Sequence, residues 1–113
     1  MTTDFKYHYH DSSLVQFVIG PRKDLNLIIH LDPIWNEGID KNVSLSFRGI
    51  ENLEKVKTFF TDKFSSRITP NAYLARIEEL KKTGKNSYLV EFDYFGQMTI
   101  DCKGHLESVQ NET

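Results

Sequence analysis

Five segments of this chain alternate apolar and polar residues, and this pattern limits the fold more than any other feature of the sequence. The alternating segments cover residues 14–19, 25–31, 43–48, 88–94 and 97–102. Successive side chains of a strand point to opposite faces, so each segment is expected to be a strand with one apolar face. Short connections between these segments favour antiparallel pairing. The pattern therefore predicts a sheet that buries one side.

One segment has the spacing of a helix instead. Its apolar residues recur at intervals of three and four positions, at Leu53, Val56, Phe60 and Phe64. This spacing places them on one face of a helix, and most of the neighbouring charged residues fall on the other faces. Acidic residues near the start and Lys63 near the end suit the helix dipole. A helix is predicted at about 51–64.

Residues 69–83 fit two different structures. Thr69 and Pro70 form a typical helix start, and Gly84 could end that helix, so local propensity favours a helix. Residues 82–86 also make a good hairpin loop, in which case residues 74–80 would be a strand paired with the next one. Both structures remain open at this point.

The expected fold class is α+β. We predict a mainly antiparallel twisted sheet of about five to six strands, with one helix (about 51–64) packed on one face. The 113 residues fit a single domain spanning 1–113, with loose ends at about 1–7 and 108–113. A chain of this length buries roughly two-thirds of its unfolded surface.

Composition excludes several classes of function. The 14 Lys and Arg residues against 16 Asp and Glu residues give a formal charge of −2, which argues against a broadly basic nucleic-acid or membrane-surface protein. The sequence contains no apolar run of the roughly 18–20 residues that a membrane span needs. The opening residues lack the apolar stretch of a signal peptide, and Cys102 has no partner for a disulfide. A cytoplasmic location is therefore expected, with Cys102 a buried and unreactive thiol.

Charge is distributed unevenly along the chain. Residues 51–85 carry eight basic against five acidic residues, a formal charge of +3, whereas residues 86–113 carry one against five, a charge of −4. The acidic surface predicted from this asymmetry has Glu91, Asp93 and Asp101 on the last hairpin, His30 and Asp32 on the same face, and Trp35 beside them. Such a surface would steer a protein partner with a basic surface. A solvated face that serves solubility is the alternative.

Two other candidate sites involve histidine. His8, His10 and Asp11 could supply metal ligands, because two histidines separated by one residue point the same way on a strand. His30 and Asp32 could form a hydrolase-like dyad, but no turn of the sequence exposes a nucleophile beside them. The glycines are scattered and form no phosphate-binding loop. We therefore expect a non-catalytic protein that needs no cofactor, with metal or small-ligand binding at the histidines as the alternative function.

Three passages together resemble a known group of proteins: residues 10–14 (HDSSL), residues 43–53 (VSLSFRGIENL) and residues 95–102 (FGQMTIDC). They are similar to small bacterial domains of unknown function, some of which are grouped with immunity proteins of polymorphic toxin systems. The resemblance implies an immunity-like binding protein, and it implies a strand rather than a helix at 72–81. It supplies no catalytic residues. Whether the open edges of the sheet pair into a homodimer is left undecided.

Overall fold

A computed structural model describes residues 5–65 and 73–109. Its elements follow in the order β1 (Ser13–Ile19), β2 (Leu25–His30), β3 (Asn42–Arg48), α1 (Leu53–Phe64), β4 (Ala75–Gly84), β5 (Ser87–Phe92), β6 (Gly96–Asp101) and β7 (Gly104–Val109). This confirms the α+β class, with seven strands in the sheet rather than five or six. Within the described ranges, no helix is long and apolar enough to cross a membrane.

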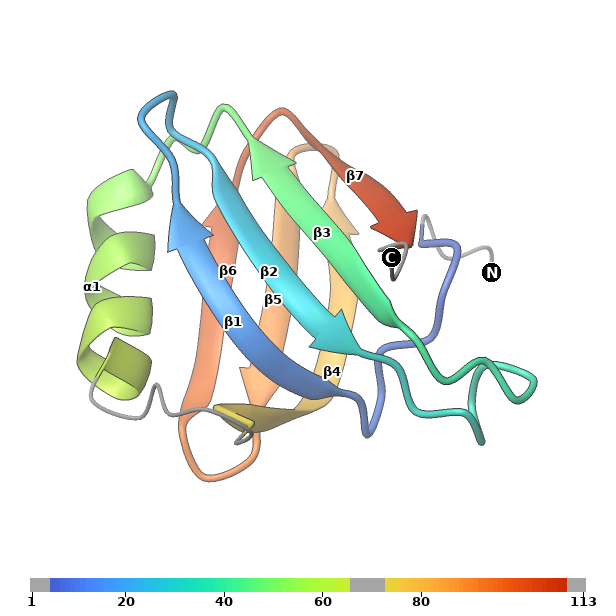
Figure 1. Cartoon of the computed structure of the whole chain (residues 1–113). Helices are drawn as coiled ribbons and strands as arrows, with labels where there is room; N and C mark the ends of the chain where they lie inside the picture. Colours follow the sequence, from blue (N-terminus) through green and yellow to red (C-terminus); the bar gives the residue numbers. More distant parts are fainter. Residues whose placement is uncertain (1–4, 66–72, 110–113) are drawn as a thin grey trace.

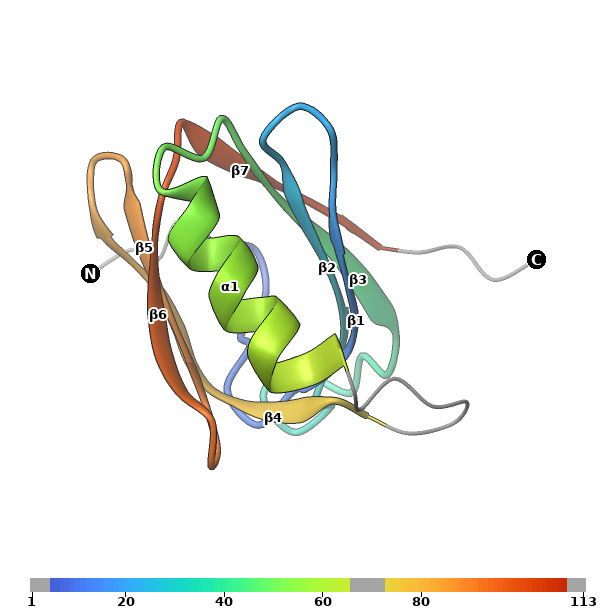
Figure 2. The ribbon, with the colours of Figure 1, turned by 90° about the vertical axis from the view of Figure 1, so that its left-hand side faces the viewer.

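The sheet is strongly bent. Its strand order is β6-β5-β4-β1-β2-β3-β7, and every neighbouring pair is antiparallel. β1 and β4 pair over only two positions, Ser13 with Arg76 and Leu14 with Ala75. The sheet folds over at this short junction, so that β1, β2, β3 and β7 form one layer and β4, β5 and β6 form the other (Figures 1 and 2).

The core lies between these two layers, and α1 closes it on one side (Figure 2). The buried face of α1 consists of Val56, Phe60 and Phe64, as its spacing predicts. The Phe60 and Phe64 rings pack against Phe92 of β5, with ring centroids 5.9 and 5.1 Å apart, and Phe60 also meets Phe17 of β1. Because these rings contact both β5 and β1, α1 joins the two layers. Each such buried side chain stabilises the fold by about 1.5–3 kcal/mol.

The helix favoured by local propensity at 69–83 is wrong where the structure describes it. Residues 75–84 form β4, which pairs with β5, as the resemblance implies. Ile77 lies opposite Phe92 and Leu80 opposite Val90, so the strand places apolar groups against the core. This tertiary contact outweighs the helix propensity of a charged segment. The expected helix start at Thr69 and Pro70 lies outside the described residues.

The last strand is not among those predicted from the sequence. The alternating segments end at residue 102, yet β7 begins at Gly104 and pairs with β3 along six positions. β7 also contacts the segment 5–12, which we name the strap, through the buried side chain of Glu107. The strap crosses from β7 to the start of β1 and closes the core on the side away from α1 (Figure 1). The Phe5 ring of the strap is buried, 4.6 Å from the ring of His105 in β7.

The ends expected to be loose fall partly outside the description, which omits residues 1–4 and 110–113. Of the described residues in those ranges, Phe5 is buried, and Ser108 and Val109 pair with β3.

Candidate functional site

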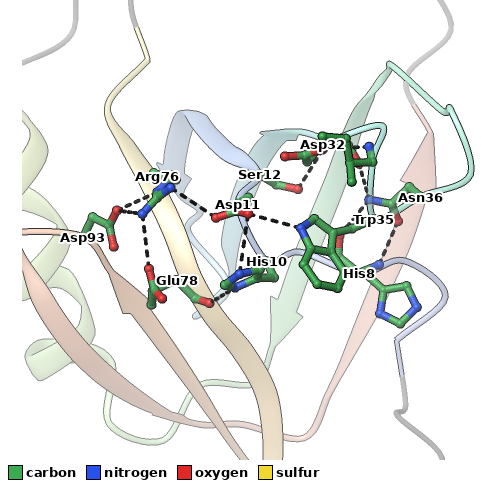
Figure 3. A network of polar contacts seen from close by, with 11 residues as sticks. His8, His10, Asp11, Ser12, Asp32, Trp35, Asn36, Arg76, Glu78 and Asp93 are labelled. Atoms are coloured by element: carbon green, nitrogen blue, oxygen red, sulfur yellow. Dashed lines mark hydrogen bonds and ion pairs between the residues drawn. The ribbon is translucent and has the colours of Figure 1, made fainter.

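A polar network forms where the strap meets β4, and Asp11 lies near its centre (Figure 3). The Asp11 backbone has a positive φ of 63°, and its amide donates to the Ile77 carbonyl at 2.9 Å. This conformation points the carboxylate at two donors, the Arg76 guanidinium at 3.2 Å and the Trp35 indole N–H at 3.1 Å. The Nε2 of His10 lies 3.5 Å away and becomes a third donor when the imidazole is protonated.

Arg76 connects the strap to the second layer. Its guanidinium contacts Asp11, Glu78 of β4 at 3.5 Å, and Asp93 in the turn between β5 and β6. A hydrogen bond shared with Asp93 raises the pKa of Glu78, whereas hydrogen bonds from Glu78 and Arg76 lower the pKa of Asp93. Asp93 therefore keeps its negative charge, and Glu78 is the first of the two to take up a proton.

Asn36 fixes the position of Trp35. Its side chain is buried and hydrogen-bonds the backbone of His8 twice: Oδ1 accepts from the His8 amide and Nδ2 donates to the His8 carbonyl, both at 2.8 Å. Nδ2 also donates to the Asp32 carbonyl at 2.9 Å. These bonds lock the loop that follows β2 onto the strap. The indole of Trp35 consequently lies edge-on to His10, with ring centroids 5.1 Å apart.

Beside this network the surface is hollowed by about 490 Å³. We name this feature the acidic hollow. Its walls carry aromatic and carboxylate side chains from the strap, the loop after β2, β4 and β5, including Tyr7, Tyr9, Trp35, Glu78, Glu79 and Glu91. Histidines 8 and 10 line it as well. The hollow thus combines aromatic rings, about half of the indole being exposed, with three carboxylates.

The carboxylates of the hollow are incompletely neutralised. Glu79 and Glu91 lie directly opposite each other on β4 and β5, an arrangement that is destabilising for like charges. Lys81 pairs with Glu79 at 3.2 Å. Glu91 is partly buried, and among the described residues it has neither an ion pair nor a side-chain hydrogen bond. The site therefore favours an added positive charge.

His10 lines the same hollow. Its Nδ1 donates to the Glu78 carbonyl oxygen at 2.6 Å. This hydrogen bond, with the charge of Asp11 as a further cause, raises the pKa of His10. As the pH falls, His10 is therefore protonated earlier than an ordinary histidine and adds a positive charge to the wall of the hollow.

A second depression, of about 510 Å³, lies across Arg76 and Asp93 from the acidic hollow. We name it the tyrosine groove, because Tyr73 and Tyr94 line it and are both exposed. Tyr94 has a positive φ of 69° and is fully exposed to solvent. Aromatic side chains displayed in this way beside charged groups are typical of protein-binding surfaces.

The structure brings together three of the six residues predicted for the acidic surface. Trp35 and Glu91 line the hollow, and Asp93 reaches it through Arg76. Asp101 is the last residue of β6, at the end of that strand away from Asp93, and its amide donates to Asn52 beside the start of α1.

The remaining two predicted residues, His30 and Asp32, make separate contacts. Asp32 accepts a hydrogen bond from the Ile34 amide in its own turn. The ring nitrogens of His30 contact Asn42 and Asp40, at 2.8 and 2.5 Å. The His30–Asp32 dyad considered from the sequence is therefore not formed.

The metal-site residues are adjacent in sequence but do not converge. Figure 3 shows the imidazoles of His8 and His10 pointing in different directions. Nδ1 of His10 is engaged by the Glu78 carbonyl, and Asp11 is engaged by Arg76. In the ranges that the structure covers, no three His, Cys, Asp or Glu side chains are grouped as metal ligands would be. Nothing in this geometry favours metal binding.

The sequence does not predict four residues of the site: Arg76, Glu78, Glu79 and Asn36. The only signal for the first three was the dense charge of residues 76–82, which the sequence equally allows in a solvated helix. Asn36 gave no signal, because its role depends on a contact with His8, 28 positions away. Comparisons with protein-family models, with curated proteins and with solved structures gave no match.

Proposed function

We propose that this chain is a small, non-catalytic binding protein of the cytoplasm, immunity-like in its action, which uses the acidic hollow to cover a basic surface of a protein partner. The observation that supports the proposal most directly is the environment of the Glu91 carboxylate. This group lies partly buried opposite Glu79 and has no cation among the described residues. A Lys or Arg side chain of a partner would supply the missing charge.

The composition of the surface supports a protein rather than a small ion as the partner. Trp35, Tyr73 and Tyr94 present exposed rings around the charged network. Tryptophan and tyrosine are enriched among the residues that dominate binding energy at protein interfaces, with charged groups around them. The tyrosine groove lies next to the hollow, so a single partner can cover both.

The polar network also supports binding rather than catalysis. Asp11 is held by the Arg76 guanidinium and the Trp35 indole, and Nδ1 of His10 is held by a carbonyl. These contacts hold the wall of the hollow in one shape. A rigid surface loses little conformational entropy when a partner binds.

The test uses a nine-residue peptide that carries three basic residues, Lys or Arg, separated by Gly and Ser. Trp35 is the single tryptophan of the chain, so its fluorescence reports on the hollow directly. The wild-type protein is expected to bind the peptide, and to bind it less tightly as salt is added. An acidic peptide of the same length is expected not to bind.

Two double variants locate the binding. Glu79→Gln with Glu91→Gln removes two charges from the hollow, whereas Glu54→Gln with Asp62→Asn removes two exposed charges from α1. We expect affinity to fall about tenfold in the first and to stay unchanged in the second, because each lost contact is worth up to about 1 kcal/mol. Equal affinities for the two variants, or no binding by the wild-type protein, would contradict the proposal.

A further inference from the structure

We infer that the side chain received by the acidic hollow is an arginine of the protein partner, in preference to a lysine. This inference rests on the proposed function and adds the chemical group that the hollow selects.

The walls of the hollow suit a planar cation. Trp35 and Tyr7 provide accessible aromatic rings on the walls that also carry the glutamates, whereas the ring of Tyr9 is almost fully buried. A guanidinium stacks flat on such rings and is more weakly hydrated than an ammonium, so it loses less when it leaves water. A volume of about 490 Å³ also leaves room for a long side chain.

The facing carboxylates suit a forked donor. Glu79 and Glu91 stand opposite each other on paired strands, where side chains are about 4.5–5.5 Å apart at Cβ. Two neighbouring carboxylates offer several acceptor positions at one place. A guanidinium has five N–H donors in a fixed plane and can bond both groups at once, whereas a lysine ammonium acts as a compact point charge.

The protein already holds one arginine in this manner next to the hollow. Arg76 is bonded by Asp11, Glu78 and Asp93, which come from the strap, β4 and the turn after β5 (Figure 3). Arg76 thereby shows that carboxylates displayed by this part of the molecule surround a guanidinium from several sides. Glu79, the residue after Glu78, continues this arrangement into the hollow with Glu91.

The experiment compares three peptides that differ at one side chain: Ac-Gly-Ser-Arg-Ser-Gly-amide, the same peptide with Lys, and the same peptide with citrulline, which keeps the shape of arginine without its charge. Binding is followed by Trp35 fluorescence and by amide NMR shifts of residues 78–80 and 91. We expect the Arg peptide to bind about five to ten times more tightly than the Lys peptide, and the citrulline peptide to show no binding.

A variant confirms the position. Glu91→Gln is expected to reduce the preference for Arg over Lys to about twofold or less, because one arm of the fork is lost. Its urea unfolding midpoint should equal or exceed that of the wild-type protein, since repulsion with Glu79 is relieved, and this measurement shows that the variant is folded.

The outcomes separate the two proposals. Equal binding of the Arg and Lys peptides overturns the preference for arginine and leaves the proposed function standing. An unchanged Arg preference in Glu91→Gln also overturns the inference, because the preference would then arise elsewhere. If neither cationic peptide binds better than the citrulline peptide, both proposals fail.

Discussion

Two residues with unusual backbone conformations lie on either side of Arg76. Asp11 and Tyr94 have φ angles of 63° and 69°, a region that costs a residue other than glycine about 1–2 kcal/mol. At Asp11 the cost is offset by the contacts of the carboxylate with Arg76 and Trp35. At Tyr94 no packing offsets it, because the side chain is fully exposed. The strain at Tyr94 therefore fits a residue kept for recognition.

Replacing Tyr94 with glycine should separate stability from binding. Tyr94→Gly is expected to stabilise the fold by about 1 kcal/mol, because glycine adopts a positive φ without a steric penalty and no buried contact is lost. Binding of a partner that covers the tyrosine groove should weaken. Urea unfolding measures the stability change.

A matched variant tests the same reasoning in reverse. Gly96 in the same turn has a φ of 90° and open space around it, so Gly96→Ala should destabilise the fold by about 1 kcal/mol through backbone strain alone. A loss of stability in Tyr94→Gly would show that the ring supports the fold after all.

At the scale of elements, the strands and the helix that depend only on local sequence patterns could be predicted. Buried residues such as Leu45 of β3 and Val90 of β5 lie where strict alternation places them, and α1 buries the face that its spacing indicates. β4 and β7 were harder to predict from the sequence, because each forms a strand only through pairing with a partner strand elsewhere in the chain. Leu80 becomes part of a strand through β5, and Gly104 begins a strand because β3 offers a free edge.

In the candidate site, too, the features set by local sequence could be predicted, and those set by contacts between distant segments could not. The acidic charge of the last hairpin pointed to Glu91 and Asp93, and the single tryptophan, Trp35, was predicted to lie beside them. Their gathering around Arg76 could not be predicted. It depends on the turn at Asp11 and on Asn36, whose bonds join segments that no sequence spacing relates.

The strap is an element without regular structure, and a buried carboxylate holds it. The side chain of Glu107 in β7 is only 3% exposed. It accepts hydrogen bonds from the Lys6 amide at 2.8 Å and from the Tyr9 hydroxyl at 2.6 Å. Burial, followed by this bond to Glu107, strongly raises the pKa of Tyr9. The strap is therefore attached by a phenol that keeps its proton.

This attachment predicts a pH dependence in alkali. Above about pH 10 the tyrosines of the unfolded chain lose their protons, whereas folded Tyr9 retains its own. The folded state then binds more protons, so the free energy of unfolding should fall as the pH rises, by up to roughly 1.4 kcal/mol per pH unit. Below about pH 9 Tyr9 is protonated in both the folded and the unfolded state, so its contribution to the free energy of unfolding does not change with pH.

Two variants isolate the contribution of Tyr9. Tyr9→Phe should flatten the alkaline decline measured by urea unfolding between pH 8 and 11, whereas Tyr7→Phe should leave it in place. Burial also raises the pKa of Cys102, so all proteins in the comparison carry Cys102→Ala. A decline as steep in Tyr9→Phe as in its parent would show that another group causes it.

At the scale of the whole molecule, a bent sheet has two edges, and one of them is partly covered. The Glu51 amide donates to the Asp101 carbonyl of β6 at 2.7 Å. The Asn52 side chain continues this pairing, because its Nδ2 donates to the Thr99 carbonyl and its Oδ1 accepts from the Asp101 amide, at 2.8 and 2.9 Å. The start of α1 thus occupies backbone groups that a strand of a second molecule would otherwise bind.

Removing this cover should promote self-association. Asn52→Ala exposes the Thr99 carbonyl and the Asp101 amide, so we expect the free energy of unfolding to fall by about 1–2 kcal/mol and dimers to increase. Sedimentation velocity of the variant and the wild-type protein at equal concentrations measures the second effect. Glu54→Ala, in the first turn of α1, is the control, because it changes the same region without touching β6. If Asn52→Ala matches the wild-type protein in both stability and sedimentation, then Asn52 does not protect the edge, and the oligomeric state must be controlled from β7.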